Sequence, residues 1–279
     1  MLIGVIGSGT MGSGIAQSFA SNDFKVFLYD ISDSMLSKGI RTITASLDRL
    51  VSKNKITKDI SDRCLKNIKT VTLIDSMSDC DLIIEAATEN KEIKKKIFKD
   101  LDGIAKSDCI LASNTSSISI NELSDSTNRA DKVIGMHFMN PVPIMKLVEI
   151  IKTDKTSNGT LKIIVDVATQ LDKIPVDCID SPGFISNRVL MPMINEAIYA
   201  LMEGVGTKEA IDQIMVLGMS HPMGPLKLAD LIGLDVCLSI LNVLKEGFNN
   251  SKYEPCPLLV DMCQQGKLGR KSGEGFYRY

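Results

Sequence analysis

Gly7-Ser8-Gly9-Thr10-Met11-Gly12 is the stretch that decides the fold of this chain. The apolar run before it, residues 2–6, is typical of a buried parallel strand. Residues 14–20 then show a helical pattern, and residues 25–29 predict a second strand that ends at Asp30. Strand, glycine-rich turn, helix, strand and terminal acid together predict a βαβ unit that binds a dinucleotide.

Each part of this turn has a physical role. Gly7 permits the tight turn, Gly9 lets the backbone approach a pyrophosphate, and Gly12 lets the helix pack close to the strand. The start of the helix offers N–H groups and a partial positive charge to the phosphates. We therefore expect cofactor contacts along the whole turn: Gly7, Ser8, Gly9, Thr10, Met11 and Gly12.

Asp30 indicates which dinucleotide is bound. It lies 23 residues beyond Gly7, close to where a ribose-binding carboxylate is expected. A carboxylate accepts hydrogen bonds from the ribose hydroxyls but repels a ribose phosphate. The neighbouring residues 29–33 include no Arg or Lys. The sequence therefore favours NAD over NADP.

Size and composition limit the remaining possibilities. The 279 residues, 44% of them hydrophobic, are enough for a dinucleotide-binding domain and a second domain. The net charge is −2, so we expect no general attraction to nucleic acid or to a membrane surface. No apolar run approaches the roughly eighteen residues that span a membrane. Seven scattered cysteines without a CxxC pair indicate no metal site and favour a reduced, cytoplasmic compartment.

Residues 34–68 are too long for a simple crossover between strands. Apolar residues recur there at helical spacing, residues 54–55 interrupt the pattern, and Thr57 is a candidate helix cap. We expect a helical hairpin that projects from the sheet. Arg49 and Lys53 lie four residues apart on one helical face, and they are either a solvated face or an anion site for a phosphate-bearing substrate.

The rest of the chain divides at residues 180–183, Asp-Ser-Pro-Gly. Before it, strands are predicted at 71–73, 81–85, 109–112, 133–136 and 146–151. Beyond it, helices are predicted at 185–202, 208–217 and 234–248, in a segment rich in methionine. We predict an α/β fold with a Rossmann-type, mostly parallel sheet and a helical hairpin insertion, followed by an all-α C-terminal domain. Residues 1–182 would bind NAD, and residues 183–279 would bind substrate and form a homodimer through their apolar helices.

His137 and His221 are the only histidines. We expect His137 to follow a strand at the edge of the sheet where ligands bind, and Glu149 lies 12 residues further along the chain. A proline-containing turn between them would fold Glu149 back against the imidazole, where a carboxylate would stabilise the imidazolium. From spacing alone, a hydrogen-bonded structural histidine is an equally good interpretation. His221, in a loop between helices, is the weaker catalytic candidate.

Several longer motifs resemble one family. They are GSGTMG at 7–12, SNTSS at 113–117, HFMNPVPIMKLVEI at 137–150, DSPGFISNR at 180–188, HPMGPL at 221–226 and LGRKSGEGFYRY at 268–279. Together they resemble the 3-hydroxyacyl-CoA dehydrogenase family over essentially the whole chain, and within it the compact bacterial 3-hydroxybutyryl-CoA dehydrogenases. The resemblance implies NAD-dependent interconversion of an L-3-hydroxyacyl-CoA and a 3-ketoacyl-CoA.

The resemblance also assigns roles to single residues. It implies that His137 is the general acid and base, Glu149 its orienting partner, and Ser116 and Asn187 the residues that contact substrate. Further contacts to NAD are implied at Asp30, Glu89, Lys94 and Asn114. The basic CoA-binding helix of the family matches the region of Arg49 and Lys53, although this stretch carries no sharp motif.

Two other functions stay open on the sequence. One is a dehydrogenase of the same two-domain plan that acts on a free hydroxy acid without CoA. The other is an NAD-binding protein without activity, because the family also resembles a structural protein of the lens. The presence of both His137 and Glu149 argues against the second.

Overall fold

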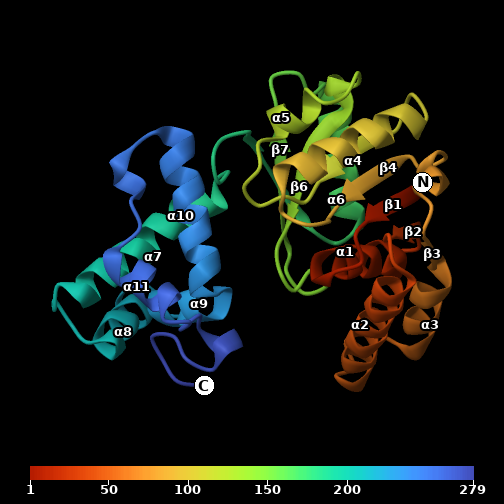
Figure 1. The fold of residues 1–279 in the computed structure, drawn as a ribbon. Coiled ribbons are helices and arrows are strands. Elements are labelled where there is room, and N and C mark those ends of the chain that lie inside the picture. The colour runs from red at the N-terminus through yellow and green to blue at the C-terminus, as the bar shows by residue number, and fades with distance from the viewer. The chain divides into compact units, whose positions relative to one another are not determined.

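The computed structural model describes residues 1–279, which divide into two compact units, Met1–Asp180 and Ser181–Tyr279 (Figure 1). The first unit is built on one eight-stranded sheet, and the second is helical. The predicted fold class, a Rossmann-type sheet followed by an all-α domain, is confirmed. No helix is long and apolar enough to cross a membrane.

The sheet has the strand order β3-β2-β1-β4-β5-β6-β7-β8. All neighbouring strands run parallel except β6 and β7, which are antiparallel. The strands are β1 (Leu2–Ile6), β2 (Lys25–Tyr29), β3 (Ile68–Val71), β4 (Leu82–Glu85), β5 (Ile110–Ser113), β6 (Val133–Phe138), β7 (Leu147–Lys152) and β8 (Ile174–Ile179). The sequence placed the third strand at residues 71–73, later than β3, because β3 is a half-exposed edge strand in which Lys69 and Thr70 interrupt the apolar pattern.

Helices connect these strands. They are α1 (Thr10–Ser21), α2 (Asp33–Ser52), α3 (Lys58–Asn67), η1 (Ile74–Met77), α4 (Lys91–Ile104), α5 (Ile120–Ser124), η2 (Ala130–Lys132) and α6 (Asn158–Gln170). The predicted helical hairpin is confirmed as α2 and α3, which lie side by side in Figure 1. The Thr57 side chain caps α3 by accepting a hydrogen bond from the N–H of Ile60.

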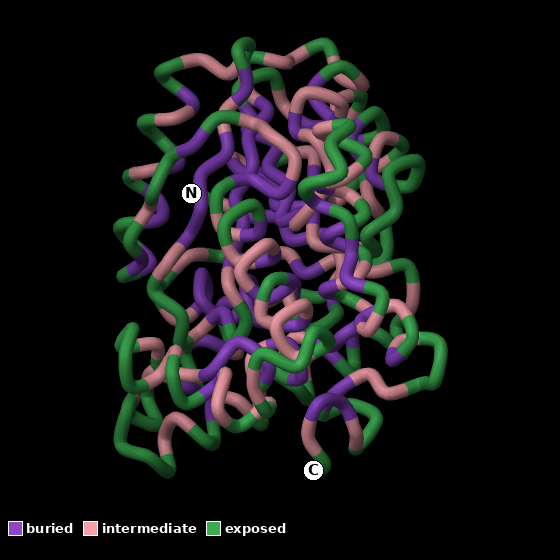
Figure 2. The backbone as a smooth tube through the Cα atoms, turned by 90° about the vertical axis from the view of Figure 1, so that its left-hand side faces the viewer, coloured by how far each residue is buried: buried purple, intermediate pink, exposed green.

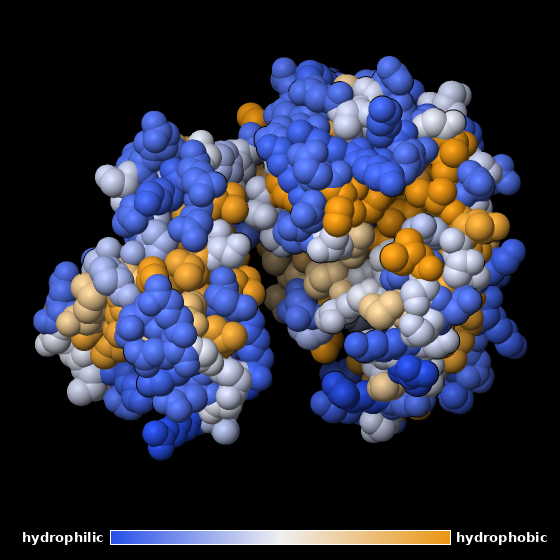
Figure 3. Space-filling view, viewed as in Figure 1, coloured by the Kyte–Doolittle hydropathy of each residue, from blue (hydrophilic) through white to orange (hydrophobic).

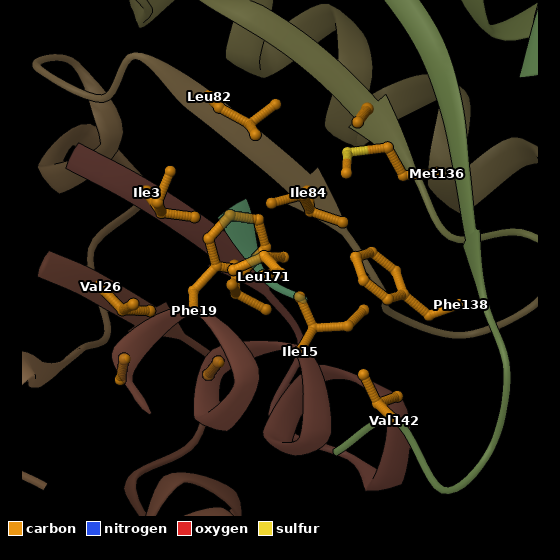
Figure 4. Close-up of a cluster of buried hydrophobic side chains, with 14 of the residues drawn as sticks. Ile3, Ile15, Phe19, Val26, Leu82, Ile84, Met136, Phe138, Val142 and Leu171 are labelled. Atoms are coloured by element: carbon orange, nitrogen blue, oxygen red, sulfur yellow. The ribbon is translucent and has the colours of Figure 1, made fainter. Parts of the chain in front are cut away.

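The core of the first unit lies between the sheet and its helices. Alternate strand residues point to opposite faces, so Ile3 packs with Phe19 of α1, whereas Gly4 faces Met77 of η1. Figure 4 shows Ile3, Phe19 and Ile84 gathered on one face, with Leu171 from the segment after α6. In Figure 2 the stretch beside the N-terminus is buried, as expected for a strand with neighbours on both sides. This packing fixes the strand ends that carry the candidate site.

The second unit consists of helices and short turns. They are α7 (Ser186–Met202), α8 (Lys208–Gly218), α9 (Pro225–Ile232), α10 (Leu234–Phe248), η3 (Ser251–Tyr253), α11 (Pro257–Gln264) and η4 (Arg270–Ser272). The sequence pattern did not predict α9 and α11, which are only 8 residues each and begin at a proline. Proline is well tolerated at the first helical position, because its missing N–H would have no partner there.

Two buried aspartates fasten the C-terminal tail to this helical unit. Asp230 accepts hydrogen bonds from the N–H groups of Phe276 and Tyr277, both at 2.9 Å, and from the Tyr279 hydroxyl at 3.0 Å. Asp212 accepts one from the Tyr277 hydroxyl at 2.8 Å. Burial and the neighbouring carboxylates raise the pKa of Tyr277, so the phenol keeps the proton that it donates.

Candidate active site

The candidate residues of the first unit follow strands that end at the same edge of the sheet. Across β1, β4 and β5, the last residues Ile6, Glu85 and Ser113 are successive partners. Ser113 is also the partner of Gly135 in β6, so His137 lies just beyond this row. Ligands bind at this carboxyl edge in open α/β sheets.

The glycine-rich turn connects β1 to α1. Gly7 has a φ of 97°, which favours glycine, and its N–H donates to the Tyr29 carbonyl at 2.8 Å. A Cβ on Gly12 would lie 1.8 Å from the Gly7 carbonyl oxygen, whereas a Cβ on Gly9 would meet nothing within 4 Å. The N-cap residue Gly9 makes no side-chain cap bond at the start of α1. The turn is therefore closely packed at Gly12 and open at Gly9, where α1 begins. An open helix start with free N–H groups fits a pyrophosphate.

Asp30 follows β2 and lies beside this turn. Its Oδ2 accepts hydrogen bonds from the N–H of Ser8 at 2.9 Å and from the Ser8 hydroxyl at 2.8 Å. These two bonds fix the carboxylate against the turn. Neither of them uses Oδ1, which can accept hydrogen bonds from ribose hydroxyls.

His137 and Glu149 are direct partners in the antiparallel pairing of β6 with β7. His137 Nδ1 lies 2.8 Å from Glu149 Oε2, and the two residues are 7% and 3% exposed. Because a carboxylate accepts, Nδ1 carries the donated proton, and Nε2 is the nitrogen that can exchange a proton with a ligand. The predicted contact is present, but β6 runs two residues further than predicted because β7 continues to pair with it.

The proline-rich segment between β6 and β7 is held by a residue that the sequence did not single out. Lys173, which is 7% exposed, donates from Nζ to the carbonyls of Val142 at 2.5 Å and Met145 at 2.7 Å. Burial lowers the pKa of Lys173. Lys173 thereby fixes the connection between the strands of His137 and Glu149.

Asn114 and Glu89 lie in the loops after β5 and β4. The Asn114 Oδ1 accepts the N–H of Phe138 at 2.9 Å, which ties the end of β6 to the neighbouring loop. Glu89 Oε1 accepts hydrogen bonds from the Thr115 hydroxyl at 2.6 Å and from the N–H of Ser116 at 2.9 Å. These contacts bring Glu89, Asn114 and Ser116 to the edge that carries His137.

Lys94, for which the resemblance implies a contact with NAD, is a buried residue of α4. It is 1% exposed, and its Nζ lies 2.7 Å and 2.8 Å from the two carboxylate oxygens of Glu85. Glu85, the last residue of β4, is 0% exposed and was also missed by the sequence analysis. Its position at the end of an otherwise apolar strand is the feature of the sequence that could have identified Glu85 as a site residue.

The remaining candidates lie elsewhere. Asn187 belongs to the first turn of α7 in the second unit and is 8% exposed. His221 lies in the segment between α8 and α9, where its N–H donates to the Met215 carbonyl at 3.1 Å. Arg49 is in the last turn of α2 and Lys53 is its C-cap, and both are exposed.

Comparison with protein families gives two matches. Residues 2–181 match the family described as 3-hydroxyacyl-CoA dehydrogenase, NAD binding domain. Residues 183–279 match the one described as 3-hydroxyacyl-CoA dehydrogenase, C-terminal domain.

Similar proteins carry related names. The chain is 53% identical over 279 residues to a probable 3-hydroxybutyryl-CoA dehydrogenase of Deinococcus radiodurans, with 100% of both chains covered. It is 50% identical to the 3-hydroxybutyryl-CoA dehydrogenase of Clostridioides difficile, in an alignment that covers 100% of this chain and 99% of that one. The crystal structure of (S)-3-hydroxybutyryl-CoA dehydrogenase PaaH1 from Ralstonia eutropha superposes with a TM-score of 0.97 at 48% identity, covering 100% of this chain and 98% of that one.

Proposed function

The chain belongs to the 3-hydroxyacyl-CoA dehydrogenase family, an NAD-dependent oxidoreductase family, and on this premise we propose that it interconverts L-3-hydroxybutyryl-CoA and acetoacetyl-CoA. The buried contact between His137 and Glu149 at the ligand-binding edge carries the proposal. The names of the similar proteins support the substrate.

The acid–base chemistry falls to His137. In the oxidation direction, Nε2 takes the proton of the 3-hydroxyl group, and Glu149 stabilises the imidazolium that forms. NAD, held by the glycine-rich turn and Asp30, would supply the acceptor for the hydride that leaves carbon 3. In reduction, the imidazolium returns its proton to the oxygen of the 3-keto group while carbon 3 gains a hydride, which bound NADH would supply.

The other candidates hold the reactants. Ser116 and Asn187 would donate hydrogen bonds to the reacting oxygen or to the thioester carbonyl. The glycine-rich turn, Asp30, Glu89 and Asn114 would hold NAD. The burial of Lys94 beneath Glu89 supports an indirect contribution from that residue. In this scheme residues 1–182 bind the cofactor, and residues 183–279 form the domain for substrate binding and dimerisation.

A spectrophotometric assay of NADH oxidation tests the function. We expect saturable activity with acetoacetyl-CoA and none with free acetoacetate at the same concentrations. Equal activity with both would favour a dehydrogenase for free hydroxy acids. Tight NADH binding without turnover of either compound would favour a binding protein.

Replacing Asp30 with alanine should change cofactor preference. The variant loses an acceptor for the ribose hydroxyls and a charge that repels a ribose phosphate. We expect NADH affinity to fall about tenfold, and the preference for NADH over NADPH to become smaller. Cofactor fluorescence titration measures both affinities. A preference of the unaltered protein for NADPH would contradict the assignment of Asp30.

Arg49 and Lys53 are proposed to bind the phosphates of CoA. The two side chains are one helical turn apart, and neither has a carboxylate partner, whereas Lys58 nearby is paired with Asp62 at 3.0 Å. The alternative is that these cations only stabilise the carboxyl end of α2.

The double variant Arg49→Ala/Lys53→Ala separates these possibilities. The nucleotide of CoA is remote from the reacting carbon, so its contacts should contribute about equally to ground and transition states. We expect a higher KM for acetoacetyl-CoA, an unchanged kcat and a weaker salt dependence, because exposed charges are screened within about 10 Å at 0.1 M salt. A pantetheine thioester without the nucleotide should react as before, and equal losses with both substrates would mean that α2 is merely destabilised.

We also propose that the C-terminal unit forms the homodimer. Large apolar side chains are exposed on and before α8, including Val205, Ile214 and Leu217, and Leu217 is 80% exposed. Figure 3 shows apolar surface on this unit between its polar areas. Sedimentation of the purified protein at twice the monomer mass of 30.4 kDa would support a dimer.

We propose a cytoplasmic location for the protein. All seven cysteines are free thiols, as is usual in a reducing compartment.

A further inference from the structure

Glu85 and Lys94 form an ion pair beneath the candidate site. They are 0% and 1% exposed, and two contacts of 2.7 Å and 2.8 Å join Lys94 Nζ to the Glu85 carboxylate. Taking two charges out of water costs about as much as their attraction returns, so a buried ion pair is a weak source of stability. Its place in the site therefore calls for another explanation.

Glu85 also binds the two loops that leave the sheet beside it. Its Oε1 accepts the N–H of Ala87 at 2.7 Å, in the loop after β4. Its Oε2 accepts the hydroxyl of Ser113 at 2.7 Å, where β5 passes into the loop of Ser116. One buried carboxylate thus holds both loops and the Lys94 ammonium.

Lys94 in turn reaches Glu89. Its Nζ lies 3.4 Å from Glu89 Oε2, while Glu89 Oε1 accepts the N–H of Ser116 at 2.9 Å and the Ser117 hydroxyl at 3.0 Å. The Glu89 side chain is 42% exposed, so this carboxylate is where the buried network reaches the surface. The contacts form one chain from Glu85 through Lys94 and Glu89 to the backbone of Ser116.

The charges of this network favour an ionised Glu89. Burial alone would raise the pKa of Glu89, but Lys94 and the hydrogen bonds from the Ser116 loop outweigh that effect and lower it. Two other lysines of α4, Lys91 and Lys95, form ion pairs with Glu122 instead. One ammonium between two carboxylates leaves a net charge of −1 on the network.

We propose that Glu85 and Lys94 are positioning residues, which hold the Glu89 carboxylate and the Ser116 loop in the arrangement that NAD and the acyl-CoA require. Glu85 orients the Lys94 ammonium, Lys94 orients Glu89, and Glu89 fixes the Ser116 backbone. The inference rests on the proposed function, in which Glu89 contacts the cofactor and Ser116 the substrate.

Three variants of the full-length protein test this chain of contacts: Lys94→Met, Glu85→Gln and the double variant. We expect each single variant to lower the melting temperature: Lys94→Met leaves the buried Glu85 carboxylate without a cation, and Glu85→Gln leaves Lys94 only the more distant Glu89 carboxylate. Each should also lower kcat/KM for acetoacetyl-CoA by about a hundredfold. The double variant removes both buried charges, so its melting temperature should recover while kcat/KM stays low. The matched control Lys95→Met, on the same helix, should leave both quantities unchanged.

The pH dependence of NADH affinity gives a readout that simple destabilisation would not change. Protonated Glu89 is a weaker hydrogen-bond acceptor than the carboxylate, so NADH affinity is lost as the pH falls through the pKa of Glu89. Lys94→Met removes the charge that lowers this pKa, and the loss should begin at a higher pH than in the unaltered protein. Glu85→Gln leaves Lys94 beside Glu89, so the loss should not move to higher pH.

Recovery of both the melting temperature and kcat/KM in the double variant would overturn the proposal and leave the pair a purely structural one. An unaltered pH dependence in Lys94→Met would equally exclude the link from Lys94 to Glu89. If the unaltered protein did not turn over acetoacetyl-CoA, the proposed substrate would be wrong. The NADH titrations would still decide whether Lys94 acts on Glu89.

Discussion

Replacing His137 with glutamine should lower kcat by roughly 10²–10⁴-fold, the usual effect of losing a general acid or base. Glutamine keeps a polar side chain beside Glu149 but cannot take up a proton near neutral pH. Because the glycine-rich turn and Asp30 lie on other strands, NADH affinity should stay nearly constant. Stopped-flow measurement of NADH oxidation gives the chemical step, and fluorescence titration gives the affinity.

His221→Gln is the matched control for this change. His221 is the other histidine of the chain, and it lies in the second unit between α8 and α9. We expect it to leave kcat within a factor of about two, because His221 is a half-buried residue of a loop that carries none of the proposed cofactor or substrate contacts. A drop of less than about tenfold in His137→Gln, with chemistry rate-limiting, would assign the acid–base role to another group.

The sequence predicted the parts of the fold that repeat a simple pattern. Residues 2–6 coincide with β1, which is apolar throughout and is followed by Gly7. Residues 25–29 coincide with β2, in which a run of apolar and aromatic residues follows Lys25 and ends before Asp30. The hairpin of α2 and α3 was predicted from apolar residues at helical spacing and the Thr57 cap. Helices as short as α9 and α11 have too few turns for a helical spacing of apolar residues to be recognised.

Some contacts of the candidate site could be predicted from the sequence, and others could not. His137 and Glu149 were predicted as a pair because they flank a proline-containing turn, and the register of β6 and β7 makes them direct partners. The contacts of Glu85 with Ser113, and of Lys173 with Val142, join residues 28 and 31 positions apart. No local pattern announces such contacts, because they depend on which strands become neighbours in the folded sheet.

Two alanine substitutions in the glycine-rich turn should have different effects, because the two glycines are required for different reasons. A Cβ on Gly12 would lie 1.8 Å from the Gly7 carbonyl oxygen, so Gly12→Ala must displace backbone. We expect it to lower the free energy of unfolding by about 1–3 kcal/mol and to abolish measurable NADH binding. Thermal unfolding and fluorescence titration measure the two effects.

Gly9→Ala should affect only the cofactor. Gly9 has a φ of −67°, which alanine adopts readily, and its Cβ would meet no protein atom within 4 Å. The melting temperature should therefore stay the same. NADH affinity should fall at least about tenfold, because the new methyl group would occupy the space where the backbone approaches the pyrophosphate. Unchanged NADH affinity in Gly9→Ala would show that the pyrophosphate does not lie against Gly9, and the open space above this turn would then need another occupant.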